Sequence, residues 1–476
     1  MTGIADIRKQ LDTKKISCAE LTKTYIDAAK RENAGLNAFI SFTGEAAIKA
    51  AQKVDAVIAK GGSISPLAGV PFVMKDNFST DGIRATAGSK MLDNYIPIFS
   101  ADVWEKMQAA GAVMLGKGNM DEFEMGGTSY YGEAKNPHDG TRSADGTAAA
   151  VAAGVSAFGI GTDTAGSVRA PASHCGIVGL RPTYGAASRL GILAYTSSFD
   201  QTGIFATSVR DTALVYDAII GQDPRDMTSR AAPAVSDKLT GDIKGKKIGI
   251  PRSFYEGVSA DVEASLRVMA KRLEKLGATV VDVDFPLLKE AVSAQFIIAC
   301  AEASSNLGRF DGHRFGYHAE GTTSLDEYVC TSRTVGFGDE VRRRVMLGTF
   351  MLSTGYFEKY FATAKQVCLG IKNEMLTLLS DVDMLLTPSA HETAAPLGRK
   401  LSHVESYMTE ICTIPASIAG VPAMSVPCGF DKDGMPVGAQ LIGGKFREVD
   451  ILDAALAFET ETGCAFIKST IGGVSL

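Results

Sequence analysis

The chain has 476 residues, of which 45% are hydrophobic and 21% charged, and its formal net charge is −6. This length predicts two or three domains, although large α/β enzymes often remain undivided. The acidic balance lacks the strong basic field of a protein that binds nucleic acid directly. The short run VRRRV at 341–345 is a local basic patch, and such runs are typically solvated faces.

Cysteines and histidines, eight and six in number, are scattered without a CxxC pair or metal-ligand spacing. We therefore expect no metal site, and we expect the thiols to be reduced and buried, as in a cytoplasmic protein. The N-terminal segment has no apolar stretch or cleavage site typical of a signal peptide. No apolar run reaches the roughly 18 residues that a membrane helix needs. The sequence thus predicts a cytoplasmic protein without membrane contact.

In the first half of the chain, helical spacing and short apolar runs alternate. Ser17 is a suitable N-cap for the second helix. The alanine-rich tract 147–160 has the composition of a buried helix. The predicted elements are helices at 3–12, 18–33 and 44–60, a strand at 68–76 ending near Lys75, a helix and then a strand within 100–123, the helix 147–160, and a turn-bounded strand within 174–185.

The second half begins with another α/β stretch and then becomes mostly helical. Its predicted elements are a strand at 245–254, a helix at 260–276, a strand at 277–286, a mostly helical region at 287–380, strands within 381–390 and 422–444, and a helix near 447–462. No internal repeat or Pro/Ser-rich linker divides the chain. We expect one α/β domain, 1–476, containing the helical region.

A tract of small residues, 141–171, contains Ser167 directly after Thr-Ala-Gly. Several glycines beside one hydroxyl suggest backbone that approaches a substrate, where N–H groups can meet an oxyanion. Neither a phosphate-binding loop nor a GxSxG elbow matches the tract. Tight helix packing with an incidental serine is the alternative reading.

Lys75 ends the apolar strand, and burial is able to keep such an amine neutral. A neutral lysine can serve as the general base for a serine. Together with Ser143 and Ser167, it would form a Ser–Ser–Lys relay that needs neither histidine nor metal. Taken by itself, Lys75 fits a surface charge or an ion-pair partner better than a general base.

Several segments, in order along nearly the whole chain, resemble the amidase-signature family. Within it they resemble the glutaminase subunits, called A-subunits, of tRNA-dependent Glu/Asp amidotransferases. The matching segments are LAGVPFVMKDN, GKGNMDEFEMG, KNPHD, GTDTAGSVRAPASHCGIVGLRPTYGAASRLGILAYTSSFDQTGIFATSV, AEASSNLGRFDGHRFGY, GFGDEVRRRVMLGTFMLS and TIPASIAGVPAMSVPCGF.

The resemblance implies an amidase-signature fold, in which helices cover both faces of a large mixed β-sheet. It also implies that Ser167 is the nucleophile and Lys75 the base, with Ser143 as the bridging serine between them. The backbone N–H groups of the turn that ends at Ser167 would form the oxyanion hole. Besides the serine itself, this turn contains Thr164, Ala165 and Gly166.

By the same resemblance, the substrate is glutamine, gripped by Arg344 at its α-carboxylate and by Glu410 at its α-amino group. Glu410 stands where the family has an aspartate. The partners implied are a tRNA-binding kinase, called the B-subunit, and a small C-subunit, with ATP and Mg²⁺ used on the kinase partner. This chain would need no cofactor of its own, and it would meet tRNA mainly through that partner.

The chain departs from the family pattern near the proposed site. Before Ser143 the family has a glycine pair, which eases a cis peptide bond, whereas this chain has Arg142, and Asp145 replaces a further glycine. The segment 125–132 is about three residues shorter than in the family, and Ala165 also replaces a glycine.

Three functions remain open on these grounds. The chain is a working glutaminase subunit with a remodelled pocket rim, a stand-alone amidase for another small amide, or a catalytically weakened paralogue with a binding role.

Overall fold

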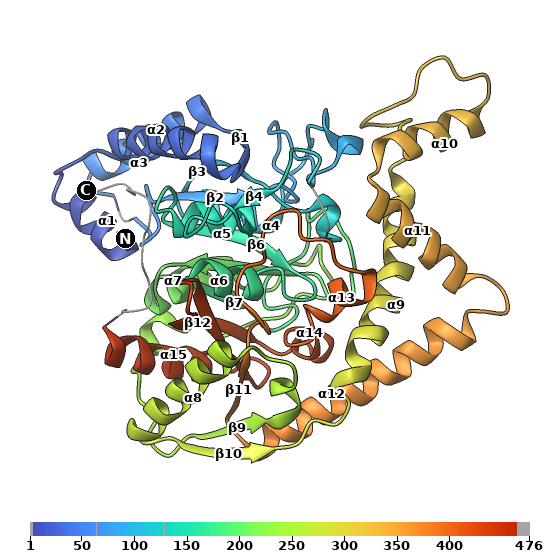
Figure 1. Ribbon diagram of the computed structural model, residues 1–476. Coiled ribbons are helices and arrows are strands. Elements are labelled where there is room, and N and C mark those ends of the chain that lie inside the picture. Colours follow the sequence, from blue (N-terminus) through green and yellow to red (C-terminus); the bar gives the residue numbers. More distant parts are fainter. Residues whose placement is uncertain (1–2, 63, 127–128, 464–476) are drawn as a thin grey trace.

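A computed structural model describes residues 3–62, 64–126 and 129–463. Its centre is a mixed sheet of 11 strands in the order β1-β3-β2-β6-β8-β7-β12-β13-β11-β9-β10. Helices cover both faces of this sheet (Figure 1). The α/β class and the large mixed sheet expected from the sequence are therefore confirmed.

The first half of the chain builds the part of the sheet from β1 to β7 and the helices around it. The N-cap expected at Ser17 is present, and with Glu20 it forms a capping box. The elements are α1 (Ile4–Asp12), α2 (Cys18–Leu36), β1 (Phe39–Phe42), α3 (Gly44–Ala59), β2 (Pro71–Lys75), α4 (Asp102–Ala109), β3 (Val113–Gly118), β4 (Ala134–Lys135), β5 (Ser143–Ala144), α5 (Gly146–Ala152), β6 (Phe158–Asp163), α6 (Arg169–Cys175), β7 (Val178–Arg181), β8 (Gln201–Ala206) and α7 (Val209–Ile219).

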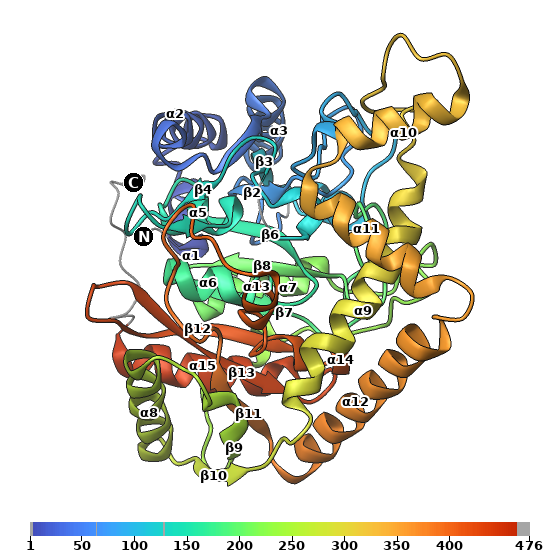
Figure 2. The same cartoon turned by 45° about the vertical axis from the view of Figure 1, so that its right-hand side comes forward.

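The second half adds the remaining strands and a group of helices along one flank. The region 287–380 is mostly helical, and α9, α11 and α12 run along one flank of the molecule (Figure 2). The elements are β9 (Lys247–Pro251), α8 (Ala260–Lys275), β10 (Thr279–Val283), α9 (Leu288–Asn306), α10 (Leu325–Gly336), α11 (Asp339–Leu352), α12 (Thr363–Asp381), β11 (Met384–Pro388), α13 (His403–Met408), α14 (Ile414–Ala419), β12 (Ala423–Phe430), β13 (Pro436–Gly443) and α15 (Glu448–Thr462).

The single helix predicted for 147–160 is wrong in its second part. Helix α5 ends at Ala152, and residues 158–163 form the strand β6. Gly154 follows the helix with a φ of 72°, a left-handed conformation that glycine adopts without strain. Because alanine and glycine give no clear period of 2 or 3.6, the change from helix to strand left little trace in the composition.

Three neighbouring strands position the functional residues. Strand β2 pairs in parallel with both β3 and β6. Parallel strands end at the same edge of a sheet, and ligands of open α/β sheets bind at that edge. Lys75 is the last residue of β2 and Asp163 the last of β6, so the segment leading to Ser167 starts beside Lys75.

The cysteines differ in part from the sequence expectation. The seven within the described residues are all free, but Cys330 is exposed, and Cys464 lies outside the described residues. No helix in the described part of the chain is long and apolar enough to cross a membrane.

Candidate active site

A pocket of about 330 Å³ opens at the carboxyl edge of β2, β3 and β6. Lys75, Ser143, Gly166, Ser167 and Glu410 are among the residues that line it. The topology thus brings together residues that are far apart in the sequence. Thr164, Ala165 and Arg344, which were also expected at the site, do not line the pocket directly.

Ser167 lies half-buried in the turn between β6 and α6. Among the described residues, no acceptor takes a hydrogen bond from the backbone N–H groups of Ala165, Gly166 and Ser167. Gly166 has a φ of 138°, and a Cβ on it would stand 2.2 Å from Thr413 Oγ1. Only glycine fits there, and the turn presents unpaired donors next to a hydroxyl, as an oxyanion hole requires.

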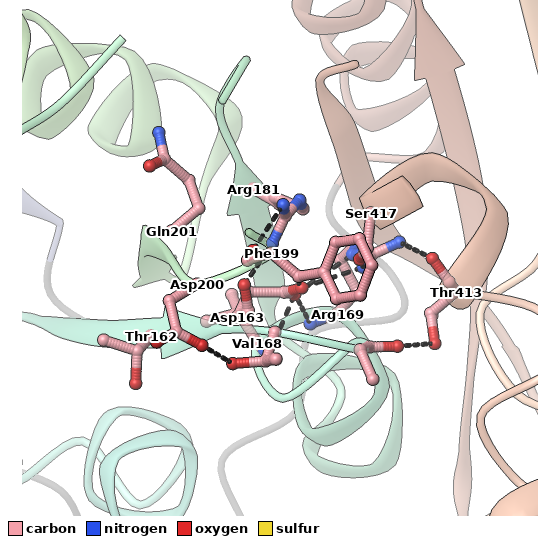
Figure 3. Close-up of polar contacts among 12 residues, drawn as sticks. Thr162, Asp163, Val168, Arg169, Arg181, Phe199, Asp200, Gln201, Thr413 and Ser417 are labelled. Atoms are coloured by element: carbon pink, nitrogen blue, oxygen red, sulfur yellow. Dashed lines mark hydrogen bonds and ion pairs between the residues drawn. The ribbon is translucent and has the colours of Figure 1, made fainter. Parts of the chain in front are cut away.

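A buried ionic cluster underlies this turn (Figure 3). Asp163 accepts hydrogen bonds from Arg169 Nε at 3.0 Å and Arg169 Nη2 at 2.8 Å, and Arg181 Nη1 lies 3.1 Å from its Oδ1. All three side chains are fully buried. Burial opposes the charge of Asp163, but the two guanidinium groups outweigh it and hold its pKa well below the usual range.

Arg169 ties the same turn to the C-terminal part of the chain. Its guanidinium donates to Thr413 O at 2.8 Å, Gln440 Oε1 at 2.7 Å and Ser417 Oγ at 2.8 Å. A bidentate, always charged side chain with further acceptors holds its neighbours in one geometry. The turn that bears Ser167 is therefore fixed from beneath.

Lys75 is buried between two carboxylates. Its Nζ lies 2.8 Å from Glu124 Oε1 and 3.3 Å from Asp145 Oδ2, and its side chain is only 3% exposed. Burial alone would lower the pKa of Lys75, but Glu124 and Asp145 reverse the effect and raise it above the usual range. The expectation that burial keeps this amine neutral is therefore wrong for this conformation.

Ser143 lies on the short strand β5, and the Arg142–Ser143 peptide is trans, like every peptide bond among the described residues. The Ser143 hydroxyl donates to Ala395 O at 3.3 Å, and Arg142 Nη1 donates to Ala394 O at 2.7 Å. In the described structure, no hydrogen bond links Ser143 to Lys75 or to Ser167. The three relay residues share one pocket but are not joined in this conformation.

Glu410 lines the pocket, and Arg344 lies next to Gly126, which also lines it. Arg344 Nε donates to Glu340 at 2.7 Å and Nη1 donates to Tyr195 Oη, while Nη2 has no acceptor among the described residues. A Cβ on Gly126, which lines the pocket, would lie 3.8 Å from this Nη2. Burial raises the pKa of Glu410 to about 7, and the charge of Arg344 partly offsets this shift.

Glu124, Tyr195 and Thr413 belong to the site but escaped the sequence analysis. Glu124 lies in the segment GKGNMDEFEMG, directly before the shortened stretch 125–132. Its place beside that stretch is the sequence signal that could have identified it as a site residue. Tyr195 contacts Arg344, and Thr413 lines the pocket. Only the fold brings these two residues to their places, so no signal in the sequence points to them. Part of the stretch 125–132, at 127–128, lies outside the described residues.

Metal-binding side chains do not gather anywhere in the described ranges: no group of three or more His, Cys, Asp or Glu residues would hold an ion.

The sequence model of the Amidase family matches residues 20–452. Together with the fold and the serine–lysine pocket, this match assigns the class: the chain belongs to the amidase family of enzymes.

Known relatives narrow the similarity further. The A-subunit of the glutamyl-tRNA(Gln) amidotransferase from Streptococcus pneumoniae (strain Hungary19A-6) is 44% identical over 472 residues, 96% of each chain. The crystal structure of the corresponding A-subunit from Thermotoga maritima superposes with a TM-score of 0.78 at 37% identity, covering 93% of this chain and 91% of that one. A peptide amidase from Stenotrophomonas maltophilia has a TM-score of 0.84 at 27% identity, with 97% of each chain covered.

Proposed function

We propose that the chain is the glutaminase subunit of a tRNA-dependent amidotransferase. The observation that carries this proposal is the shared pocket of Lys75, Ser143 and Ser167 beside the unpaired N–H groups of the 164–167 turn. Its support on the sequence side is the near full-length similarity to the A-subunits of glutamyl-tRNA(Gln) amidotransferases.

In the proposed reaction, Ser167 Oγ adds to the side-chain amide carbon of glutamine. Its proton passes through Ser143 to Lys75, once Lys75 is neutral. The amide oxygen accepts hydrogen bonds from the backbone N–H groups of Ala165, Gly166 and Ser167. Ammonia leaves with a proton returned from the lysine, and water then releases glutamate from the acyl-serine. For this relay, the Ser143 hydroxyl has to turn away from Ala395 O.

Substrate binding uses the two charged groups of Arg344 and Glu410. The free Nη2 of Arg344 is the donor for the α-carboxylate of glutamine, and Glu410 is the acceptor for its α-ammonium. Arg344 approaches the pocket beside Gly126, where a Cβ would only touch its Nη2, at 3.8 Å.

Partners complete the proposed function. Ammonia passes to a tRNA-binding kinase, the B-subunit, assisted by a small C-subunit, and converts misacylated Glu-tRNA(Gln) or Asp-tRNA(Asn) to the amide. ATP and Mg²⁺ act on the kinase partner, tRNA binds mainly there, and the assembly is a cytoplasmic heterotrimer.

A second candidate, a stand-alone amidase, is favoured by the charge of the pocket. Five carboxyl side chains line it, against two cationic ones. The five are Asp121, Glu124, Glu133, Asp145 and Glu410, and the cations are Lys75 and Arg399. Such a lining favours an amide that carries an ammonium group and no carboxylate.

The deciding experiment measures ammonia release by the purified chain with and without the kinase and small partners. Glutamine is compared with glycinamide, an amide that has an ammonium but no carboxylate. Ser167→Ala should lower glutamine hydrolysis more than about a thousandfold. Ser265→Ala, a half-buried serine on α8, is the matched control and should retain full activity.

Each outcome decides between the readings. Glutamine turnover that rises with the partners supports the glutaminase subunit, whereas faster unaided turnover of glycinamide supports the stand-alone amidase. If neither amide is hydrolysed, the result supports the third reading, a catalytically weakened paralogue. Glutamine turnover that persists in Ser167→Ala contradicts the assigned nucleophile.

A further inference from the structure

Glu124 makes the closest contact to the proposed base, and no step above uses it. Besides its 2.8 Å ion pair with Lys75, its Oε1 accepts from Thr162 Oγ1, and its Oε2 lies 3.3 Å from Thr164 Oγ1. Its side chain is 2% exposed. One buried carboxylate thus connects the amine of Lys75 with the turn that leads to Ser167.

The backbone that carries Glu124 is strained. Phe123 and Glu124 have φ values of 49° and 62°, in the left-handed region that non-glycine residues rarely enter. Such conformations cost free energy and persist only where the surroundings hold them. Backbone hydrogen bonds from Phe123 N to Ala87 O and from Glu124 N to Asp121 O hold this backbone. The contacts of the Glu124 side chain with Lys75 and Thr162 hold it as well.

Asp145, the second carboxylate at Lys75, has a separate structural role. Its Oδ1 caps helix α5 by accepting from Thr147 N at 2.8 Å and Ala148 N at 3.1 Å. Its contact with Lys75 is also longer, at 3.3 Å. A change at Asp145 would therefore disturb the helix as well as the amine, which makes Glu124 the cleaner residue to test.

A lysine can accept a proton from serine only after losing one of its own. The two carboxylates favour the ammonium form and raise the pKa of Lys75. Asp121 adds to this field from the end of β3, and Glu133, Glu410, His174 and Arg399 are the other titratable or charged groups in the pocket lining. Burial lowers the pKa of His174, and Arg399 is an exposed residue.

We propose that Glu124 is a positioning residue for amide hydrolysis: it holds Lys75 as an ammonium in the resting site, so that loss of this proton limits turnover. This inference rests on the proposed role of Lys75 as the base. The proton leaves to solvent through the pocket and gives a neutral amine. That amine then takes the serine proton while the serine oxygen bonds to the amide carbon.

The first test is the pH dependence of kcat/KM for glutamine in Glu124→Gln. Glutamine at this position still accepts a hydrogen bond from Lys75 but carries no charge. The rise of activity with pH should move to lower pH by about one unit or more, since a neighbouring opposite charge shifts a pKa by about one to three units. At a pH on the rising part of the wild-type curve, the variant should be about tenfold faster.

Glu122→Gln is the matched control. Glu122 is a buried carboxylate two residues away that accepts from Ser89 Oγ and Gly338 N and does not contact Lys75. Its pH profile should follow the wild type. Coincident profiles for Glu124→Gln and the wild type would overturn the inference.

A second measurement follows Lys75 without relying on turnover. The ¹³Cε resonance of Lys75, assigned by its loss in Lys75→Met, should remain that of an ammonium from pH 6 to 9 in the wild type and titrate at lower pH in Glu124→Gln. A wild-type midpoint anywhere below pH 9 overturns the inference even if the variant fails to fold. If glutamine is not hydrolysed but the resonance behaves as expected, the substrate assignment fails and the role of Glu124 stands.

Discussion

Two buried charge clusters flank the end of β6, and they have opposite compositions. Asp163 is one anion between two arginines, whereas Lys75 is one cation between two carboxylates. Successive side chains of a strand point to opposite faces, so Asp163 meets the arginines while its neighbours Thr162 and Thr164 meet Glu124. The same short segment therefore belongs to both clusters.

The difference lies in which cation is able to lose its proton. Arginine keeps its charge at any pH relevant to proteins, so the Asp163 cluster fixes geometry and takes no part in proton transfer. Lysine can be deprotonated, so the Lys75 cluster is adjustable by its neighbours. The turn that bears Ser167 is held by a permanent ionic support, whereas Lys75, the proposed base, is held by one that pH and substitution can change.

The largest expected effect comes from removing the central anion. Asp163→Asn leaves two buried guanidinium groups without a counter-charge, and we expect the free energy of unfolding to fall by about 3–5 kcal/mol. Chemical denaturation measures this loss. Asp282→Asn breaks an exposed pair with Arg252 and should leave the same quantity almost unchanged. A similarly small loss for Asp163→Asn would show that the cluster is not a structural support.

The next largest effect is expected when Lys75, which can lose its proton, is replaced by arginine, which cannot. Lys75→Arg keeps a positive charge between Glu124 and Asp145, so the fold should survive. Because arginine does not give up its proton, glutamine hydrolysis should fall about a hundredfold to ten-thousandfold. Ammonia release and a thermal denaturation curve separate the two effects. An active Lys75→Arg would mean that this cluster, too, is only structural.

A smaller effect is expected from pH at the substrate end of the pocket. Burial raises the pKa of Glu410 to about 7, so this group is charged above pH 7 and neutral below it. The KM for glutamine should therefore rise as the pH falls through 7, by about tenfold if the charged hydrogen bond to the α-ammonium is lost. Steady-state assays from pH 6 to 8 test this, and Glu410→Gln should remove the step. A step that persists in that variant belongs to another group.

The smallest effect concerns the segment that carries Ser143. Arg142→Ala removes the 2.7 Å bond to Ala394 O, and we expect a loss of about 1 kcal/mol in the free energy of unfolding. Arg252→Ala, in the exposed pair used above, should leave the free energy of unfolding almost unchanged. Equal losses in the two variants would mean that Arg142 does not anchor this side of the pocket.

The sequence predicted the elements whose causes are local. Capping at Ser17, most helices and strands, and the α/β class follow from side-chain periodicity and caps within single segments. The strand β6 was missed because a tract of small residues has no clear period. The resemblance supplied the candidate site, and its roles for Lys75, Ser143 and Ser167 stay predictions.

What the sequence did not reveal depends on contacts between distant segments. The charge state of Lys75 is set by Glu124 and Asp145, which lie 49 and 70 positions further along the chain (124 − 75 and 145 − 75). Burial of Lys75 was foreseen, but burial acts on the pKa in the opposite direction to these neighbours. Which effect prevails, burial or the neighbouring carboxylates, depends on distances that only the folded structure shows.

The reach of Arg169 also bears on when the enzyme becomes competent during its synthesis. Its partners Thr413, Ser417 and Gln440 lie 244, 248 and 271 residues further along the chain, so they leave the ribosome long after it. Domains form as their contacting segments emerge, and contacts this distant in sequence form late. A nascent chain therefore lacks the full support of the Ser167 turn until Gln440 has left the ribosome, and the pocket cannot take its final form before then.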